Sequence, residues 1–427
     1  MRVAARQLTS AGPEPAEVLR RLARRALDRG LAPPAALTGT WFGCRAVLAP
    51  TVSVTSVATD PFAVPDRQPE VAGGADGVVG GGWFGYLGYG LTDPSPHHRL
   101  LPTAAWGWAD HVLRYDHSGA WWFEALVPTG APDPLDLATE LADLLRAVPL
   151  PPTGWPPTEL APPSPAAHQK AVRACVEAIA AGEIFQANIC SRFQAGFDGD
   201  PVALFATGID RLAPKRAAFL TGDWGALVSF SPELFLSRHG NRVRSTPIKG
   251  TLPRRGPADA GNAERLRASV KDVAENVMIV DLVRNDLGRV AETGSVAVPE
   301  LLAVHPAPGV WHLASTVEAR LPAALGTAEL LAATFPPGSV TGAPKLRALE
   351  IIAGLEDQPR EVYCGAIGLA SPVAGLELNV AIRTIEISGD RLWLGAGGGI
   401  TADSDPEAEW QECLHKIAPL AALLRND

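Results

Sequence analysis

The chain has 427 residues, of which 47% are hydrophobic and 19% charged, and its formal net charge is −9. This composition is typical of a globular protein and excludes an intrinsically disordered chain. The negative charge argues against a protein that binds nucleic acid or an acidic membrane surface, because such affinity comes largely from Lys and Arg.

Targeting segments and cysteine framework motifs are not evident in the sequence. No run of about 18 apolar residues occurs, so we expect no membrane-spanning helix. The N-terminal stretch lacks the apolar core of a signal peptide. The five cysteines are widely spaced and form no Cys-x-x-Cys pair. This usage favours reduced, mostly buried thiols in a cytoplasmic protein.

The first part of the chain predicts a mixed α/β unit. The segment "PAEVLRRLARRAL" (15–27) has the periodicity of an amphipathic helix, and "CRAVLAP" (44–50) and "HVLRYD" (111–116) alternate like strands. From residue 128 to about 164 proline dominates on both sides of one predicted helix (135–148), which is incompatible with a central strand. We therefore expect two units, residues 1–150, which end in this linker, and residues 151–427.

The second part predicts an irregular mixture of strands and helices. A helix from 166 turns strand-like near Ile184, residues 224–246 suggest paired strands, and residues 263–290 suggest one long helix. A strand, a Gly-rich loop and a final helix follow over 392–424. Because strands and helices do not alternate regularly, an α+β architecture with large, mainly antiparallel sheets fits better than a βαβ series.

Two pairs of acids occur at helical spacing. Asp272 and Glu275 are three residues apart on the long predicted helix, and Glu409 and Glu412 repeat that spacing on the last one. If the two faces converged, four carboxylates would surround one point, and Mg²⁺ is the usual cation for such oxygen ligands. Acids at this spacing are also common on solvated helix faces, which is the alternative.

Glu233 and Lys249 are candidates for acid and nucleophilic chemistry. Glu233 lies in a predicted strand, "SPELFL", where desolvation would raise its pKa and suit a general acid. An edge-strand glutamate that points at water is the alternative. Lys249 lies in "STPIKGTLPR" and is one of six lysines among 37 Lys and Arg residues. Unlike arginine, lysine can act as a nucleophile, although an ordinary turn residue would fit the pattern equally well.

Two Gly-rich segments could offer backbone N–H groups to a carboxylate. "FPPGSVTGAPKLRALEII" (335–352) includes Thr341 and precedes a helix that we expect to open at Pro344. "GAGGGI" (395–400) includes Gly398 and follows a predicted strand. Neither segment has the spacing of a nucleotide-binding loop, and tight turns are the alternative for both.

Taken together, these segments resemble the chorismate-utilising enzymes, a family that includes anthranilate synthase component I, aminodeoxychorismate synthase component I and the isochorismate and salicylate synthases. The resemblance spans roughly residues 165–427 and is carried, in chain order, by "GEIFQANICSRF", "SFSPELFL", "TPIKGTLPR", "KDVAENVMIVDLVRNDLGRV", "VWHLAST", "FPPGSVTGAPKLRALEII", "YCGAIG", "AIRT" and "GAGGGITADSDPEAEWQECLHK". The N-terminal part resembles the family more loosely, through "LTGTWFG" and "GGGWFGYLGYGL". The resemblance implies a sandwich of large sheets with helices packed outside.

Two positions discriminate among the branches of the family. The aminodeoxychorismate synthases resemble Pro-Ile-Lys-Gly-Thr at the motif that here contains Lys249, Gly250 and Thr251, whereas anthranilate synthases resemble Pro-Ile-Ala-Gly-Thr. The members that add water usually carry a lysine base where this chain has Gln186. Because glutamine cannot act as that base, the isochorismate and salicylate alternatives lose their key residue.

The resemblance also implies a ligand set. The ring carboxylate of chorismate would bind Mg²⁺ held by Glu275 and Glu412, with Asp272 and Glu409 acting through water. Further substrate contacts implied by the family are Arg383, Tyr363 and the backbone near Gly398 for the enolpyruvyl carboxylate, His312 near the ring carboxylate, and Gln186, Gly250, Thr251, Thr341 and Lys416 as polar neighbours.

The implied reaction has two steps. Lys249 would attack ring carbon 2 while Glu233 protonates the departing 4-hydroxyl, and ammonia would then add at carbon 4 and expel the lysine. The product is 4-amino-4-deoxychorismate, for p-aminobenzoate and folate or a derived metabolite, with ammonia from a separate class I glutamine amidotransferase subunit. The alternatives are an anthranilate synthase component I and a non-catalytic chorismate-binding subunit.

Overall fold

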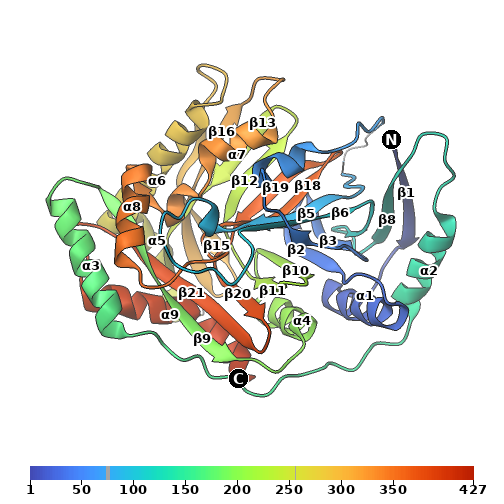
Figure 1. Cartoon of the computed structure of the whole chain (residues 1–427), viewed down its shortest axis with the longest axis horizontal. Helices are drawn as coiled ribbons and strands as arrows, with labels where there is room; N and C mark the ends of the chain where they lie inside the picture. The colour runs from blue at the N-terminus through green and yellow to red at the C-terminus, as the bar shows by residue number, and fades with distance from the viewer. Residues whose placement is uncertain (74–76, 255) are drawn as a thin grey trace.

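Two large antiparallel sheets and nine helices make up the chain in a computed structural model that describes residues 1–73, 77–254 and 256–427 (Figure 1). The first sheet has 11 strands in the order β1-β8-β7-β3-β2-β10-β11-β20-β21-β9-β17. The second has 10 strands in the order β14-β16-β13-β12-β19-β18-β5-β6-β4, with β15 paired to β16. The predicted α+β class with mainly antiparallel sheets is confirmed.

The helices of the described residues are α1 (Pro15–Arg29), α2 (Leu135–Arg146), α3 (Pro165–Ala180), α4 (Pro201–Leu212), α5 (Asn262–Ala268), α6 (Val270–Gly288), α7 (Thr327–Thr334), α8 (Lys345–Leu355) and α9 (Pro406–Arg425), with short 3-10 turns η1 (Pro61–Asp66), η2 (Tyr89–Leu91), η3 (Pro257–Asp259) and η4 (Gly338–Val340).

The strands are β1 (Arg2–Thr9), β2 (Ala35–Trp41), β3 (Cys44–Ala49), β4 (Thr55–Ser56), β5 (Gly82–Leu87), β6 (Ala104–Ala109), β7 (His111–Tyr115), β8 (Trp121–Val127), β9 (Gln186–Gly196), β10 (Arg216–Gly222), β11 (Gly225–Ser229), β12 (Leu234–His239), β13 (Arg242–Thr246), β14 (Ile248–Pro253), β15 (Ala297–Ala307), β16 (Val310–Arg320), β17 (Gly342–Ala343), β18 (Ala366–Ser371), β19 (Gly375–Val380), β20 (Thr384–Ser388) and β21 (Arg391–Ile400).

The core has a layer between the sheets and a layer on each outer face. In β10, Ala218 and Leu220 pack between the sheets, whereas Ala217 and Phe219 face the helices α1, α4 and α9. Period-two alternation explains how one strand serves both layers. The helices α6 and α7 cover the outer face of the second sheet. The predicted sandwich with helices outside is therefore confirmed.

The stretches on either side of the predicted boundary at residue 150 contribute strands to the same sheets. Strand β2 pairs with β10, and β5 pairs with β18. The Pro-rich linker after α2 runs along the outside of the molecule to α3 (Figure 1). The division of the chain into units 1–150 and 151–427 stays a prediction.

Several predicted elements are observed, and three differ in detail. The helix expected over 263–290 is broken at Ser269, whose side chain accepts a hydrogen bond from the Asp272 backbone N–H and caps a separate helix, α6. The helix expected to open at Pro344 begins at Lys345, with Pro344 as its cap. The segment "GAGGGI" lies within β21 and not in a turn after it.

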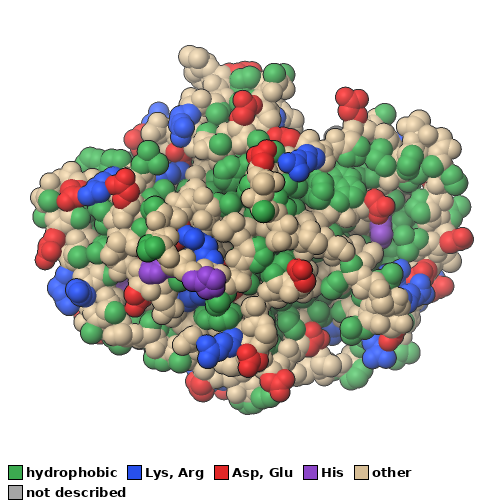
Figure 2. Space-filling model, viewed as in Figure 1, with side chains coloured by type: hydrophobic (Ala, Val, Ile, Leu, Met, Phe, Trp, Pro, Cys, Tyr) green, Lys and Arg blue, Asp and Glu red, His purple; other side chains and the backbone are tan. Residues whose placement is uncertain are grey.

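The surface and the thiols agree with the composition. On the face seen in Figure 2, Lys and Arg side chains are interspersed with Asp and Glu. All five cysteines are free, and four of them are buried. Within the described residues, no helix combines the length and the apolar character needed to cross a bilayer.

Candidate active site

Lys249 lies on β14 and faces the acidic helix α6. Its Nζ is 4.0 Å from Oε2 of Glu275, and only 10% of the lysine side chain is exposed. The next residue, Gly250, has φ +89°, and a Cβ there would lie 3.0 Å from the Cβ of Asp272. A glycine is needed both for this backbone conformation and for the close approach of α6. The lysine is therefore enclosed beside a carboxylate, and the strand geometry excludes an ordinary turn residue.

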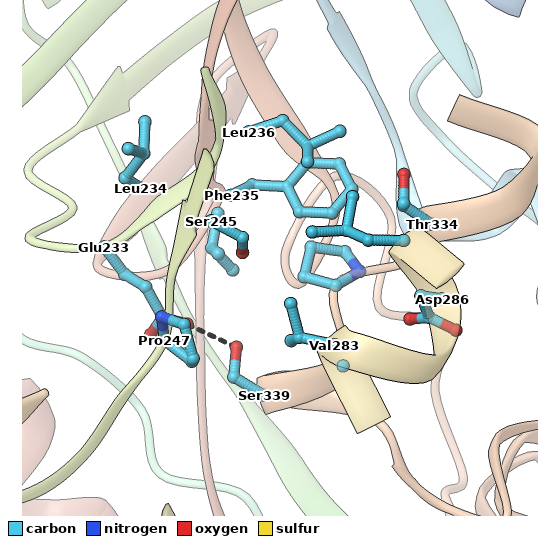
Figure 3. A pocket seen from close by; sticks show the side chains of 14 residues that line it. Glu233, Leu234, Phe235, Leu236, Ser245, Pro247, Val283, Asp286, Thr334 and Ser339 are labelled. Carbon is cyan, nitrogen blue, oxygen red and sulfur yellow. Dashed lines mark hydrogen bonds between the residues drawn. The ribbon is translucent and has the colours of Figure 1, made fainter. Parts of the chain in front are cut away.

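Glu233 is buried and directly precedes β12, one residue outside the strand in which we expected it. Burial raises the pKa of its carboxyl to about 7, against the opposing effects of a hydrogen bond from Ser339 Oγ and the nearby charge of Lys249. Figure 3 shows the Ser339 side chain directed at Glu233. The interpretation as a solvated edge glutamate is wrong. A carboxyl with this pKa can hold a proton near neutral pH and donate it.

Glu233 is one of the residues that line a small cavity (Figure 3). The cavity measures about 10 Å³ and is lined mostly by apolar side chains, among them Phe235, Leu236 and Val283. Ser245 and Asp286 also line it. A space of this size holds at most about one water molecule. The surroundings of Glu233 are therefore nearly dry, which accounts for the strong effect of burial on its pKa.

The glycines of β21 allow acidic side chains to approach the sheet. A Cβ at Gly399 would collide with Nε2 of Gln186 and would lie 3.2 Å from Oε2 of Glu275. A Cβ at Gly398 would lie 2.9 Å from Oε2 of Glu409 and 3.6 Å from Oε1 of Glu412. These glycines thus leave space where the two acidic helices and Gln186 meet.

Each acidic helix face is neutralised in part by lysines. Lys271 Nζ is 3.0 Å from Glu409 Oε1, and Lys416 Nζ is 2.7 Å from Glu412 Oε1. Burial raises the pKa of Glu275, with a further contribution from Glu412, while Lys249 opposes it. Burial acts in the same direction on Glu412, but Lys416 outweighs it and lowers the pKa. The carboxylates and the lysines therefore share one electrostatic environment.

The same acids supply donors that fit a hard cation. Glu275 Oε1 and Glu409 Oε2 are buried and have no hydrogen-bond partner. Buried carboxylate oxygens without partners are costly, and Mg²⁺ prefers oxygen ligands of this kind. In the ranges that the structure describes, no three His, Cys, Asp or Glu side chains converge as a metal site. The Mg²⁺ site, with Asp272 and Glu412 as its other members, stays a prediction.

Arg383 and His312, two of the predicted substrate contacts, lie before β20 and on β16. Arg383 precedes β20 and is half-buried with φ +49°, and no described carboxylate forms an ion pair with it. His312 on β16 accepts or donates a hydrogen bond with Thr251 Oγ1 at 2.9 Å. Burial, together with the charges of Arg383 and Lys215, lowers the pKa of His312 to about 3. The unpaired guanidinium beside a neutral imidazole can accept an anionic ligand.

The remaining predicted contacts lie around the Gly-rich strand and the turn η4. Lys416 donates to Gly397 O at 2.7 Å. Tyr363 is buried over Gly395, with its hydroxyl 3.7 Å from Cys190 Sγ. Thr341 is buried, and its hydroxyl donates to carbonyls of its own turn. The structure brings all of these residues to one region, while their contacts with a ligand stay predictions.

Sequence reasoning missed three groups of the site. Ser339 reaches Glu233, Lys271 pairs with Glu409, and Arg360 binds the backbone of two site segments. Lys271 could have been found, because it directly precedes Asp272 on a helix. No local pattern signals the other two contacts. The Ser339–Glu233 bond joins residues 106 positions apart, and Arg360 binds a backbone carbonyl, Asn188 O, 172 positions away.

Fold and site together define a protein of the chorismate-binding type, and comparison with known proteins supports this. The sequence pattern of the chorismate binding enzyme family matches residues 49–422, so the chain belongs to this family. It is 47% identical over 247 residues to "Aminodeoxychorismate synthase component 1" of Salmonella typhimurium (57% of this chain, 54% of that protein).

Two anthranilate synthase relatives agree with the assignment to this family. The chain is 35% identical over 377 residues to "Anthranilate synthase component 1" of Streptomyces coelicolor, which covers 81% of this chain and 73% of that protein. The crystal structure of anthranilate synthase component I from Streptococcus pneumoniae superimposes with a TM-score of 0.74 at 25% identity, over 100% of this chain and 92% of that one. The matched region is about half the length of the Salmonella relative.

Proposed function

We propose that this protein converts chorismate and ammonia to 4-amino-4-deoxychorismate. The observation that carries the proposal is the enclosed Lys249 facing the acidic cluster, with Glu233, a carboxyl whose pKa is about 7, close enough to interact with it. The relatives named aminodeoxychorismate synthase support the same reaction, and the solved anthranilate synthase component I shares the fold.

The chemistry divides one difficult displacement into two easier ones. The neutral amine of Lys249 bonds to ring carbon 2, both conjugated ring double bonds shift by one position, and the 4-hydroxyl leaves as water with the proton of Glu233. Ammonia then bonds to carbon 4, Glu233 takes one proton from it, both double bonds shift back, and the bond from Lys249 to carbon 2 breaks. The general acid is thus restored within one cycle, and the enolpyruvyl group is retained.

The acids and cations of the site would hold the two carboxylates of chorismate. Arg383 would bind the enolpyruvyl carboxylate, since its guanidinium has no acidic partner in the part of the chain that the structure describes. Mg²⁺ would be held by Glu275 and Glu412, with Asp272 and Glu409 acting through water. When bound, the ion would neutralise the ring carboxylate and release the acids from mutual repulsion.

The ammonia would come from a separate glutaminase, a class I glutamine amidotransferase. The printed name "component 1" of the Salmonella relative supports a second component. The purpose we propose is the supply of p-aminobenzoate, for folate or a derived metabolite.

One assay tests the reaction. Purified protein is incubated with chorismate, Mg²⁺ and an ammonium salt, and the products are separated by chromatography. We expect 4-amino-4-deoxychorismate. Anthranilate with released pyruvate would contradict the proposal in favour of the anthranilate synthase reaction, and unchanged chorismate would favour a binding subunit.

A further inference from the structure

Arg360 is a buried cation outside the residues assigned to substrate, acid or metal. It lies in the loop between α8 and β18 and is 4% exposed. Its Nη1 donates to Val340 O at 2.9 Å and its Nη2 to Asn188 O at 2.5 Å. Glu356 neutralises it through two contacts, at 2.8 Å and 2.6 Å. The guanidinium also lies 4.5 Å above the ring of Tyr89.

The two carbonyls that Arg360 binds lie where a strand pairing ends. Strand β17 has only two residues, which pair with Gln186 and Ala187 at the start of β9. The ladder extends by one bond, from Asn188 N to Thr341 O at 2.7 Å. The return bond to Asn188 O is absent, because Thr341 N donates to Gly338 O in the turn η4 instead. Arg360 supplies donors to Asn188 O and to Val340 O, which would otherwise be buried acceptors without partners.

Glu356 extends the same link on the other side. Its Oε1 accepts the backbone N–H of Cys190 at 2.8 Å while it also accepts from Arg360. A single ion pair thus binds both Asn188 and Cys190 of β9 and joins them to the turn η4. Bidentate, charge-assisted hydrogen bonds of this kind fix geometry more strictly than neutral ones.

The two joined segments carry groups that lie beside the acidic cluster and contact Glu233. Strand β9 begins with Gln186, which abuts Gly399 beside Glu275. The turn η4 carries Ser339, whose hydroxyl donates to Glu233. The separation of Gln186 from the Ser339–Glu233 pair therefore depends on how Arg360 holds Asn188 and Val340.

We propose that Arg360 is a positioning residue that sets the distance between the Gln186 side chain and Glu233, the acid that Ser339 contacts. This inference rests on the proposed function, because the acid it positions serves that reaction. Misplacement of reacting groups by about 1 Å can lower a rate about 100-fold, so the fork of hydrogen bonds matters as well as the charge.

The test compares Arg360→Gln, Arg360→Lys and the control Arg347→Gln. Arg347 is an exposed arginine on α8 that pairs with Glu183 and Glu350 and contacts neither site segment. The readout is the single-turnover rate at which chorismate forms an adduct with Lys249 without ammonia, measured by intact mass. We expect a fall of about 100-fold for Arg360→Gln at nearly unchanged chorismate KM, and partial recovery for Arg360→Lys, which keeps the positive charge but not the planar fork of donors. The control should match the wild type.

Hydrogen exchange supplies a readout that does not depend on activity. In Arg360→Gln we expect faster exchange of the amides of residues 186–190 and 339–343, with β18 protected as in the wild type. An unchanged adduct rate, or a uniform loss of protection over the whole chain, would overturn the positioning role. If Arg360→Gln does not fold, Arg360→Lys decides, since it keeps the charge and loses the fork. If the wild type itself forms neither adduct nor product, the proposed function fails and the exchange pattern still judges the role of Arg360.

Discussion

Replacing Ser339 with alanine should move the pH dependence of adduct formation. A carboxyl with a pKa of about 7 is roughly half protonated at pH 7, whereas one at the ordinary value of 4.5 would be only about 0.3% protonated. Burial accordingly raises the fraction of active acid by roughly 150-fold. The hydrogen bond from Ser339 stabilises the ionised form and holds the pKa of Glu233 below what burial alone would give.

The size of the change follows from the lost hydrogen bond. A hydrogen bond to a charged group contributes about 1.5–3 kcal/mol, and 1.36 kcal/mol corresponds to one pH unit. The alkaline limb of the rate, which reports loss of the acid's proton, should therefore move upward by about one pH unit or more in Ser339→Ala. The absolute rate at low pH should fall, because the carboxyl is no longer oriented.

The assay is the single-turnover rate of Lys249 adduct formation between pH 6 and about pH 9, without ammonia, whose own titration would otherwise contribute. Ser245→Ala is the matched control, since Ser245 lines the same cavity and makes no hydrogen bond to Glu233. An alkaline limb that stays in place in Ser339→Ala, or moves equally in Ser245→Ala, would refute Glu233 as the titrating acid.

Three further predictions follow from the site and the core. Glu275→Gln should abolish Mg²⁺ binding measured by calorimetry, whereas Glu264→Gln, which changes an exposed side chain of α5, should not. A chelator should stop turnover until excess Mg²⁺ is added, and turnover that survives chelation would contradict the metal assignment. Arg383→Gln should raise the chorismate KM by about 10- to 100-fold, whereas the exposed Arg391→Gln should leave it unchanged, and an equal KM in both would remove Arg383 from the substrate site. Arg216→Gln should lower the free energy of unfolding by about 3–5 kcal/mol at pH 7, because it leaves Glu377 buried without its 2.7 Å partner. Burial opposes ionisation of Glu377, but His239 and Arg216 outweigh it and hold its pKa below the ordinary value of 4.5. The stability from this pair is therefore present above the ordinary pKa and is lost as the pH falls. A difference in unfolding free energy between Arg216→Gln and the wild type that does not shrink toward pH 3 in denaturant melts would contradict this account.

Local pattern was sufficient for much of the fold. The helix α1, the strands β3 and β7, and the final helix follow from periodicity that one segment carries by itself. The break at Ser269 could not be predicted in this way, because the apolar pattern continues through it and only one side chain, that of Ser269, caps the new helix. The glycines of β21 suggest a turn in sequence, yet they pair along β9 as a strand, and their missing side chains leave room for Gln186 and the acids.

The site was predictable where residue types carry chemistry, and less so where the fold supplies the partner. Lys249, Glu233 and the two acid pairs could be named from spacing and resemblance, and the structure places them in one region. The Ser339 bond to Glu233 and the Arg360 bond to Asn188 join residues 106 and 172 positions apart. Such contacts depend on topology, which a single sequence specifies only through the whole fold.

The most direct test of the covalent mechanism is the intact mass of the protein after incubation with chorismate and Mg²⁺ without ammonia. We predict a species heavier by chorismate less one water, located on Lys249 by peptide fragmentation and lost in Lys249→Ala. On addition of ammonium this species should decay as 4-amino-4-deoxychorismate appears. Product formation with no adduct at any time, or with full activity in Lys249→Ala, would contradict the role assigned to this lysine.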